Sequence, residues 1–308
     1  MSATLTESTP AEVQAPAFPV PPASAEQDPS AAGGRAWRIL SSLRPGLVLA
    51  WAVIGLVIAW ALVPGLFSSE NPLAGVAAQK LRAPSAEHIF GTDAIGRDLY
   101  ARMVHGSIHS LSGALLAVTL GMVVGTLIGL LAGSLGSWID TVLMRIIDVL
   151  LAVPALLLAL SIIILMGPGT LNAAVAVGIG SVAAFARLTR SEVLKVSRLD
   201  YVEAAYASGG RRWAVLARHV LPNSLGPVAS LAAMQFGTAI LAISTLGFLG
   251  YGAPPPTPEW GLLIAEGRNY VATSWWLTSI PGLLVVAVVL SANRISQSLG
   301  GTRNGGTR

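Results

Sequence analysis

The sequence alternates between long apolar runs and short polar segments, and the apolar runs show no polar face at helical spacing. Two stretches, Val149 to Ala186 and Val220 to Pro258, contain no Asp, Glu, Lys or Arg. A helix of about 20 apolar residues spans the hydrocarbon core of a bilayer, so each stretch is long enough for at least one crossing. A large soluble helical protein would need polar faces along its helices, which these runs lack. The pattern predicts an all-α membrane protein.

Six transmembrane helices fit the pattern best. Gly167-Pro168-Gly169 divides the longest apolar run into two helices joined by a tight turn. The composition agrees, because charged residues make up only 11% of the 308 residues, against roughly 25% in soluble domains. The predicted spans are residues 46–67, 108–133, 139–166, 170–189, 222–247 and 274–297.

The N-terminal segment differs from the rest of the chain. Residues 1–34 are rich in Ala, Pro, Ser and Glu, a composition that buries too little apolar surface to fold. The first apolar run starts near Gly46, after three arginines, which favours an uncleaved first span over a signal peptide. The predicted divisions are a disordered N-terminal tail at 1–45, a first helix and external segment at 46–106, a core at 107–298 with a polar loop at 187–223, and a tail at 299–308.

Basic residues are distributed unevenly between the two sides of this topology. With the N-terminus inside, thirteen of them lie in cytoplasmic segments and five in external segments. Cytoplasmic loops carry the excess of Lys and Arg, so both termini are predicted to be cytoplasmic. The cytoplasmic set is Arg35, Arg38, Arg44, Arg187, Arg190, Lys195, Arg198, Arg211, Arg212, Arg218, Arg294, Arg303 and Arg308, and the external set is Lys80, Arg82, Arg97, Arg102 and Arg268.

The sequence also excludes several kinds of chemistry. It contains no cysteine, which rules out disulfides, thiolate metal sites and a cysteine nucleophile. Its two lysines, Lys80 and Lys195, do not belong to a G-x-x-x-x-G-K-S/T phosphate-binding loop. If a nucleotide drives this protein, another subunit must bind it.

The polar segment between the fourth and fifth spans contains two predicted helices. Residues 191–208 favour a helix, Gly209-Gly210 interrupts it, and residues 211–220 resume it. Small side chains on the first helix let another surface approach closely. From the residues alone, two interpretations stay open: a surface on which another protein docks, or an amphipathic helix pair that lies on anionic headgroups.

One motif in this segment resembles the EAA loop of the permease subunits of bacterial ABC importers: Glu203-Ala204-Ala205-x-x-x-Gly209, nine residues, then His219-Val220-Leu221-Pro222. The resemblance extends from about residue 36 to 297 and is strongest to the second permease subunit (DppC/OppC type) of the dipeptide/oligopeptide/nickel family. The other matching motifs are His88-Ile89-Phe90-Gly91-Thr92-Asp93-Ala94-Ile95-Gly96-Arg97-Asp98 with Arg102, Phe248-Leu249-Gly250-Tyr251-Gly252, Pro254-Pro255, Trp260-Gly261, and Trp276-Leu277 with Pro281-Gly282.

This resemblance implies the type I ABC importer permease fold, a bacterial inner-membrane location and a set of partners. In that family the loop docks into a groove on a cytoplasmic ATPase, which binds ATP and Mg²⁺, so this chain is expected to be no enzyme and to hold no cofactor or metal. A second permease subunit and an extracytoplasmic binding protein are the other implied partners. The implied coupling residues are Tyr201, Glu203, Ala204, Ala205, Gly209, Arg218, His219 and Pro222, and the external family motif comprises His88, Gly91, Thr92, Asp93, Gly96, Arg97 and Asp98.

The implied function is transport of short peptides by alternating access. A nickel chelate or another peptide-sized solute is an alternative cargo for the same class of transporter. A more remote alternative is an ion-coupled secondary transporter, which needs membrane-embedded acidic residues and an internal inverted repeat. Only Asp140 and Asp148 approach the first requirement, and no repeat is apparent. A membrane scaffold without transport activity is the remaining class.

Several further residues carry competing interpretations. His105 and His109, at i and i+4, could bind a transition metal, but polar residues at the outer interface explain them better. Arg145 and Asp148 are predicted to pair with each other, rather than to serve as a proton relay, because unpaired charges within a span are costly. Asp93 is predicted to cap a short helix in a structural elbow, rather than to gate a ligand.

Two sets of residues predict packing and membrane contacts. One set of tryptophans fits an outer aromatic belt, although it could also face a delivering receptor. One set of glycines repeats every four residues, which favours close helix packing against a partner permease or within the core. The tryptophans are Trp260, Trp275 and Trp276, and the glycines are Gly121, Gly125, Gly129 and Gly133.

Overall fold

The structure, a computed structural model, describes residues 45–301, which are helical with no strand beyond one isolated bridge between Thr92 and Asp98. The predicted tail at 1–45, apart from Pro45, and residues 302–308 lie outside the described residues. The α-helices are α2 (Pro45–Leu62), α3 (Pro64–Phe67), α4 (Leu99–Leu135), α5 (Ser137–Ala152), α6 (Ala155–Met166), α7 (Thr170–Val196), α8 (Asp200–Ala207), α9 (Arg212–Val215), α10 (Leu221–Phe248), α11 (Trp260–Gly267) and α12 (Trp276–Gly301).

The helices agree with the six predicted spans, with one correction. Within residues 45–301, five helices are long and apolar enough to cross a membrane, and the pair α5–α6 makes a sixth span if it is counted as one. The third predicted span, residues 139–166, is wrong as a single straight helix, because α5 and α6 meet at 92°. Pro154 lies at the break, and a proline disfavours helical backbone at the residue before it. Val153 is accordingly extended, with ψ of 128°.

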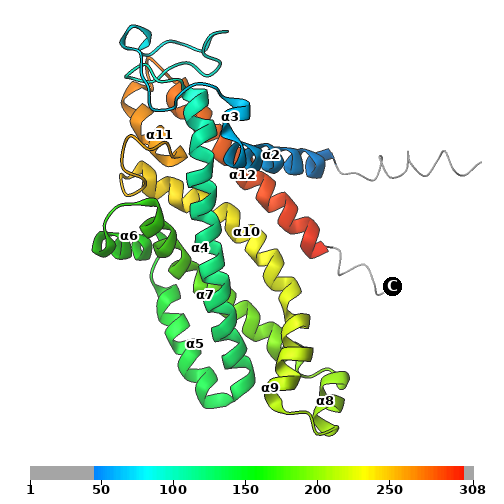
Figure 1. The fold of residues 1–308 in the computed structure, drawn as a ribbon. Helices are drawn as coiled ribbons and strands as arrows, with labels where there is room; N and C mark the ends of the chain where they lie inside the picture. Colours follow the sequence, from blue (N-terminus) through cyan, green and yellow to red (C-terminus); the bar gives the residue numbers. More distant parts are fainter. Residues whose placement is uncertain (1–44, 302–308) are drawn as a thin grey trace, which may run out of the picture. The chain divides into compact units, whose positions relative to one another are not determined.

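The glycine repeat lies at the contact between α4 and α7, which run side by side (Figure 1). A Cβ atom on Gly125 would lie 2.5 Å from the carbonyl oxygen of Val182, and one on Gly129 would lie 2.5 Å from that of Ala186. Only residues without a side chain allow two backbones to approach this closely. The repeat was predicted to pack either against a partner permease or within the core, and the structure shows that it packs within the chain's own core.

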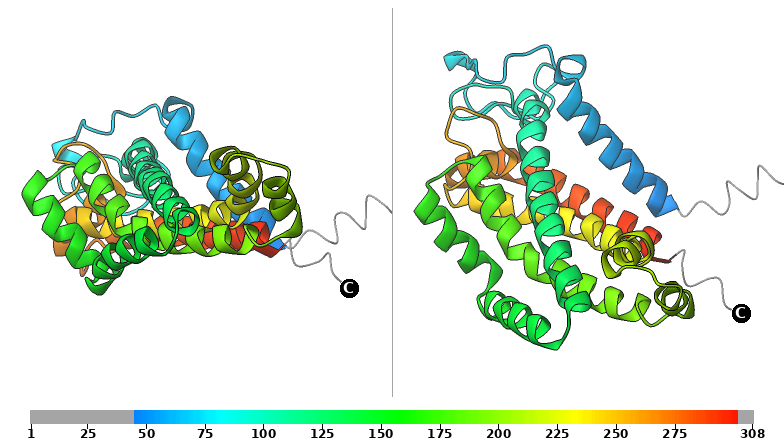
Figure 2. Two further views of the ribbon diagram at one scale, coloured as in Figure 1. Left: turned by 90° about the horizontal axis from the view of Figure 1, so that it is seen from below. Right: turned by 60° about the horizontal axis from the view of Figure 1, so that its bottom comes forward.

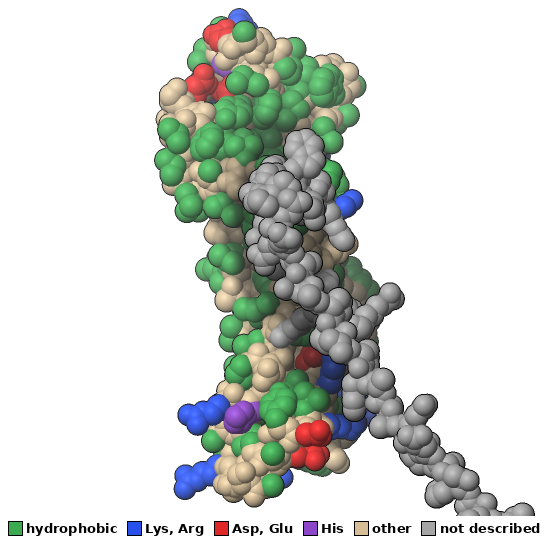
Figure 3. All heavy atoms as spheres, turned by 90° about the vertical axis from the view of Figure 1, so that its right-hand side faces the viewer, with side chains coloured by type: hydrophobic (Ala, Val, Ile, Leu, Met, Phe, Trp, Pro, Cys, Tyr) green, Lys and Arg blue, Asp and Glu red, His purple; other side chains and the backbone are tan. Residues whose placement is uncertain are grey.

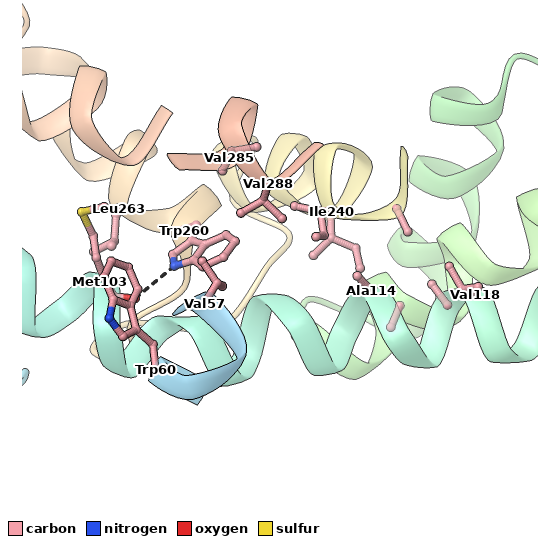
Figure 4. Packing of buried hydrophobic residues seen from close by; sticks show 14 of the residues in the cluster. Val57, Trp60, Met103, Ala114, Val118, Ile240, Trp260, Leu263, Val285 and Val288 are labelled. Atoms are coloured by element: carbon pink, nitrogen blue, oxygen red, sulfur yellow. Dashed lines mark hydrogen bonds between the residues drawn. The ribbon is translucent and has the colours of Figure 1, made fainter. Parts of the chain in front are cut away.

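The largest apolar cluster lies where α2, α4, α10, α11 and α12 meet (Figure 4). Trp260 is fully buried there and donates a hydrogen bond from its indole nitrogen to the carbonyl of Met103, at 3.1 Å. Trp276 is also buried and donates to the carbonyl of Thr92, at 3.4 Å. The predicted aromatic belt is therefore wrong for these two residues, whose polar N–H groups find partners inside the protein. Trp275, 56% exposed, does lie at the surface.

The polar segments of the described chain lie at two opposite ends of its helices. α8 and α9 lie at one end, and α11 lies with residues 68–98 at the other (Figures 1 and 2). Charged side chains gather at both ends, and several Lys and Arg side chains lie at the end that holds α8 and α9 (Figure 3). The start of α2 lies beside α12, since a Cβ atom on Gly46 would be 3.6 Å from a guanidinium nitrogen of Arg294.

Two ion pairs connect α5 to α7. Asp140 accepts hydrogen bonds from Arg190, one of them at 2.5 Å, and Asp148 accepts one from Arg187 at 2.6 Å. The predicted pair between Arg145 and Asp148 is therefore wrong. Because α5 packs beside α7, Arg187 lies within hydrogen-bond distance of Asp148 although the two residues are 39 positions apart in sequence. Both partners of that pair are about half exposed, so we expect the pair to contribute little stability.

Candidate functional site

Residues 198–220, here called the knob, follow directly from the end of α7. The predicted helix over 191–208 is wrong as a continuous element, because α7 continues to Val196 and α8 begins only at Asp200. Between them Leu199 has extended backbone angles, with φ of −83° and ψ of 140°. The knob is therefore a separate small unit mounted on a long membrane helix.

The predicted glycine break in the knob is confirmed. Gly209 has φ of +84°, a left-handed conformation that side chains disfavour, while a Cβ atom there would meet nothing within 4 Å. Gly210 is needed for a different reason, since its Cβ atom would lie 2.6 Å from the carbonyl oxygen of Ala205. The amide of Gly209 donates to the carbonyl of Tyr206 at 3.0 Å, and that of Gly210 donates to Ala205 at 3.1 Å. These bonds close the end of α8.

The return path from the knob into α10 contains a π-helical turn, Leu216–Val220, where the sequence predicted an ordinary helix. The amide of Leu221 donates to the carbonyl of Leu216, five residues earlier. Pro222 has no N–H and cannot donate to the carbonyl of Arg218, which an α-helix would require. We attribute the wider turn to this missing donor.

A small apolar core holds the knob in place. Its members are buried residues from the end of α7, from α8 and from the 215–220 turn, so α8 is fixed against both neighbouring segments. The core is separate from the large cluster around Trp260. Its residues are Val193, Val196, Val202, Val215, Leu216 and Val220.

Most of the predicted coupling residues are exposed on the outside of this core. Ala205 and His219 are half-buried, and His219 lies edge-on to Tyr201 with ring centres 6.5 Å apart. Within residues 45–301, Glu203 forms no ion pair, so its carboxylate is open to an outside partner. The exposed members of the predicted set are Tyr201, Glu203, Ala204, Gly209, Arg218 and Pro222.

The external motif at the opposite end is built around the buried carboxylate of Asp93. One of its oxygens accepts hydrogen bonds from the amides of Ile95 and Arg97, at 2.9 and 3.0 Å. The other accepts from the guanidinium groups of Arg97 and Arg102, at 2.5 and 2.7 Å. Glu266 from α11 contacts both arginines, at 3.2 and 2.9 Å. The motif therefore joins the start of α4 to α11.

Hydrogen bonding controls the ionisation of Asp93. Burial alone would raise its pKa, but the amides of Arg97 and Ile95 and the guanidinium groups of Arg97 and Arg102 lower the pKa below its ordinary value of 3.8. Asp93 thus stays ionised and balances part of the positive charge of Arg102, which is fully buried. The role of Glu266 has no signal in the sequence, because its partners lie more than 160 residues away.

The helix cap expected from Asp93 is made by a different residue. Asp98 is the N-cap of α4, and its carboxylate accepts a hydrogen bond from the amide of Ala101 at 2.7 Å. The other oxygen of Asp98 lies 2.9 Å from Nδ1 of His88. Asp93 instead closes an Asx-type turn through the amide of Ile95. The prediction of a structural turn holds, but the prediction that Asp93 caps a helix is wrong.

The remaining residues of the external motif shape its backbone. Gly91 and Gly96 have φ of +77° and +84°. A Cβ atom on Gly91 would lie 2.6 Å from the carbonyl oxygen of Arg82. Thr92 accepts a hydrogen bond from the amide of Arg82 at 2.9 Å. Together with the carboxylates of Asp93 and Asp98, these residues form one continuous hydrogen-bonded elbow.

His105 and His109, for which a metal site was the less favoured interpretation, belong to no group of three or more potential metal ligands within residues 45–301. Nδ1 of His105 lies 2.9 Å from the carbonyl of Ala101 in its own helix. Within the described residues, the histidine whose ring nitrogen lies close to two carboxylates is His88 instead.

A cavity of about 330 Å³, which no sequence pattern predicted, lies between α4, α6, α7 and α10. Its wall is mainly apolar and includes no charged side chain. Four polar residues from α7 and α10 can donate or accept hydrogen bonds at this wall. They are Ser181, Gln235, Thr238 and Thr245.

Comparison with known proteins gives consistent matches. Residues 125–300 match the family described as "Binding-protein-dependent transport system inner membrane component". The dipeptide transport system permease protein DppC of Alkalihalophilus pseudofirmus is 40% identical over 238 residues, which cover 77% of this chain and 77% of that protein. The probable D,D-dipeptide transport system permease protein DdpC of Escherichia coli is 37% identical over 226 residues, 73% of this chain and 76% of that protein.

A solved structure gives the same fold. The MetNI methionine ABC transporter, in an inward-facing crystal form, contains a chain that matches with a TM-score of 0.53 at 18% identity. The match covers 64% of this chain and 96% of that chain. At this identity the likeness concerns the fold alone.

Proposed function

Because the chain belongs to the family of binding-protein-dependent transport system inner membrane components, we propose that it is a pore-forming permease subunit of an ATP-driven importer of short peptides. The expected all-α fold of a type I importer permease is confirmed by the helices and by the likeness to a solved ABC transporter. The observation that carries the peptide assignment is 37–40% identity to dipeptide permeases over about three quarters of the chain.

In this proposal, the knob docks on a cytoplasmic ATPase that binds ATP and Mg²⁺. The knob has the required properties: it is held firmly by its own core, yet its outer surface is exposed. The carboxylate of Glu203, which forms no ion pair within residues 45–301, can meet a cation of the ATPase, and Ala204 leaves room for close approach. Since the knob follows directly from α7 and leads directly into α10, a displacement of the knob would move two membrane helices.

The remaining parts of the chain then take their expected roles. The end with α8 and α9 faces the cytoplasm, with both termini on that side, and the end with α11 faces the binding protein. The cavity between α4, α6, α7 and α10 is this chain's share of the cargo path, and a second permease subunit completes the path. The cavity's uncharged wall suits alternating access, because bound cargo meets no fixed charge that would hold it back.

Replacing Gly209 with valine tests the coupling role. A side chain at φ of +84° costs roughly 1–2 kcal/mol, which would reshape the exposed turn and leave the buried core intact. We expect normal amounts of protein in the membrane but no uptake of a labelled dipeptide and no co-purification of the ATPase. The matched control is Gly167→Val, because Gly167 also has positive φ (+87°) and open space but lies in the α6–α7 turn.

The two variants separate the possible results. We expect Gly167→Val to retain uptake and ATPase binding. Uptake at the wild-type level by Gly209→Val would overturn the coupling role. Uptake by the purified chain alone under a proton gradient would instead support the ion-coupled alternative and overturn the importer assignment.

A further inference from the structure

A pocket of about 410 Å³ lies where the knob meets the membrane helices that carry it. One wall comes from the last residues of α4, a second from the residue that follows α7, and the rest from α8, α9 and the start of the π-helical turn. None of the lining residues belongs to the predicted set of coupling residues, so the pocket is a separate feature of the knob. The lining residues are Gly133, Ser134, Leu135, Ser197, Tyr206, Arg212, Trp213 and Leu216.

The pocket combines one cation with neutral hydrogen-bond donors. Arg212 is exposed and forms no ion pair within the described part of the chain, and the lining includes no acidic side chain from that part. The hydroxyl groups of Ser197 and Tyr206 and the indole N–H of Trp213 can also donate. A guanidinium group among neutral donors is an arrangement that binds phosphate oxygens. The pocket therefore suits a phosphate group.

An apolar stripe on α4 leads from the membrane span to this pocket. Leu116, Val123 and Leu127 are exposed, and at about 3.6 residues per turn all three lie within about 20° of Ser134 around the helix. Since Ser134 is part of the pocket wall, the stripe and the pocket share one face of α4. From Ser134 to Leu116 the stripe extends about 27 Å along the helix, which is more than the depth of one leaflet of a bilayer core about 30 Å thick.

Two exposed aromatic side chains place the pocket at the level of the membrane surface. Trp213 is 60% exposed and Tyr206 is 40% exposed, and both residue types are enriched where a membrane meets water. Basic pockets between membrane helices bind anionic lipid headgroups at this level. A docked protein would also cover the two aromatic rings, but it would not explain why the pocket continues into an apolar face of a spanning helix.

We propose that this pocket binds the phosphate of an anionic phospholipid, with Arg212 as the phosphate ligand and the stripe on α4 as the contact for an acyl chain. The bound lipid would connect the end of α4 to α8 and α9 and would hold the knob at a fixed height above the membrane. The inference does not rest on the transport function, because it requires only that the chain lies in a membrane, as its family does.

The test measures lipid retention by the full chain, which is purified in a neutral detergent and stripped of lipid. Phosphatidylglycerol and phosphatidylcholine with identical acyl chains are then added in equal amounts, and native mass spectrometry counts the lipids that stay bound. We expect one phosphatidylglycerol to be retained in preference to phosphatidylcholine. Arg212→Gln should weaken the binding of phosphatidylglycerol about fivefold, as expected for the loss of one cation at an anionic membrane surface.

Arg211→Gln is the matched control. Arg211 is adjacent to Arg212, exposed and without an ion pair in the described part of the chain, but it does not line the pocket. This variant should retain phosphatidylglycerol as the wild type does. Two further probes test the acyl-chain contact: inorganic phosphate should not displace the lipid, and a short-chain phosphatidylglycerol should bind more weakly because it covers less of the stripe.

Each of the following results would overturn the proposal. Equal retention of the two lipids would remove the preference for an anionic headgroup, and an equal loss in Arg211→Gln would reduce the effect to general surface charge. Displacement of the lipid by inorganic phosphate, or equal binding of the short-chain lipid, would assign the pocket to a soluble phosphate compound. If neither lipid is retained and only Arg212→Gln loses a co-purifying ATPase, the pocket is part of the ATPase contact instead.

Discussion

Replacing Gly129 with alanine adds one methyl group where α4 and α7 are in backbone contact. The new Cβ atom would lie 2.5 Å from the carbonyl oxygen of Ala186 and 2.7 Å from Cβ of Thr189. The first distance falls 0.9 Å short of the 3.4 Å of an ordinary contact. Because the obstructing oxygen belongs to the backbone of α7, it cannot turn away as a flexible side chain can. The two helices must therefore separate locally.

The size of the effect follows from this separation. A radial gap of about 0.5–1 Å removes roughly a quarter to a half of the dispersion attraction between facing atoms, and overpacking typically costs about 1–3 kcal/mol. Alanine recovers up to about 1 kcal/mol, because it favours helix more than glycine does. We expect Gly129→Ala to lower the free energy of unfolding by about 1–2 kcal/mol.

The assay is unfolding of the purified chain in mixed micelles by SDS, followed by tryptophan fluorescence. Gly180→Ala in α7 is the matched control, because a Cβ atom there meets nothing within 4 Å. That variant should be as stable as the wild type, or more stable by up to about 1 kcal/mol. If Gly129→Ala is no less stable than Gly180→Ala, the close contact between α4 and α7 is wrong.

Two of the buried carboxylates outside the spans, Asp93 and Glu259, should give stabilities with opposite pH dependence. The pKa of Asp93 is lowered from 3.8. The ionised carboxylate therefore contributes fully to the free energy of unfolding above that value, and the contribution is lost as the pH falls through the lowered pKa. Asp93→Asn should abolish this loss of stability in acid and should lower the free energy of unfolding by roughly 3–5 kcal/mol at neutral pH. Burial raises the pKa of Glu259 above 4.5, although the hydrogen bond from the amide of Ala253 partly opposes this rise. The protonated carboxyl therefore contributes fully to the free energy of unfolding below pH 4.5, and the contribution declines as the pH rises through the raised pKa. Glu259→Gln should remove that decline and be no less stable than the wild type at neutral pH. Both predictions are checked by measuring the melting temperature of the wild type and of each variant as a function of pH. If the two substitutions changed the pH dependence of the melting temperature in the same direction, the opposite ionisation of Asp93 and Glu259 would be wrong.

The sequence could predict those features that depend on residues close together in the chain. The spans follow from uninterrupted apolar runs, and the breaks at Gly167 and Gly209 follow from the special backbone freedom of glycine. The spacing of Gly125 and Gly129 predicted a close helix contact, although it could not name the partner. The Pro154 bend was missed, because the apolar pattern continues across it unchanged.

Features that depend on tertiary contacts could not be predicted in the same way. Trp260 and Trp276 lie near the ends of apolar segments, where a membrane belt is the usual explanation. Their indole N–H groups instead bond to the carbonyls of Met103 and Thr92, more than 150 residues away in sequence. Asp148 was assigned the nearest cation along its own helix, and the structure pairs it with Arg187 of α7.

The external elbow shows why such contacts decide what a motif does. Arg102 is fully buried, and an unpaired buried cation would be strongly destabilising. Asp93 alone cannot balance it, because Asp93 also binds Arg97. Glu266 supplies the second negative charge, so two carboxylates face two guanidinium groups and the buried group is neutral overall. The motif can therefore bury its arginines only when α11 is docked, which makes the elbow and α11 one structural unit rather than two adjacent loops.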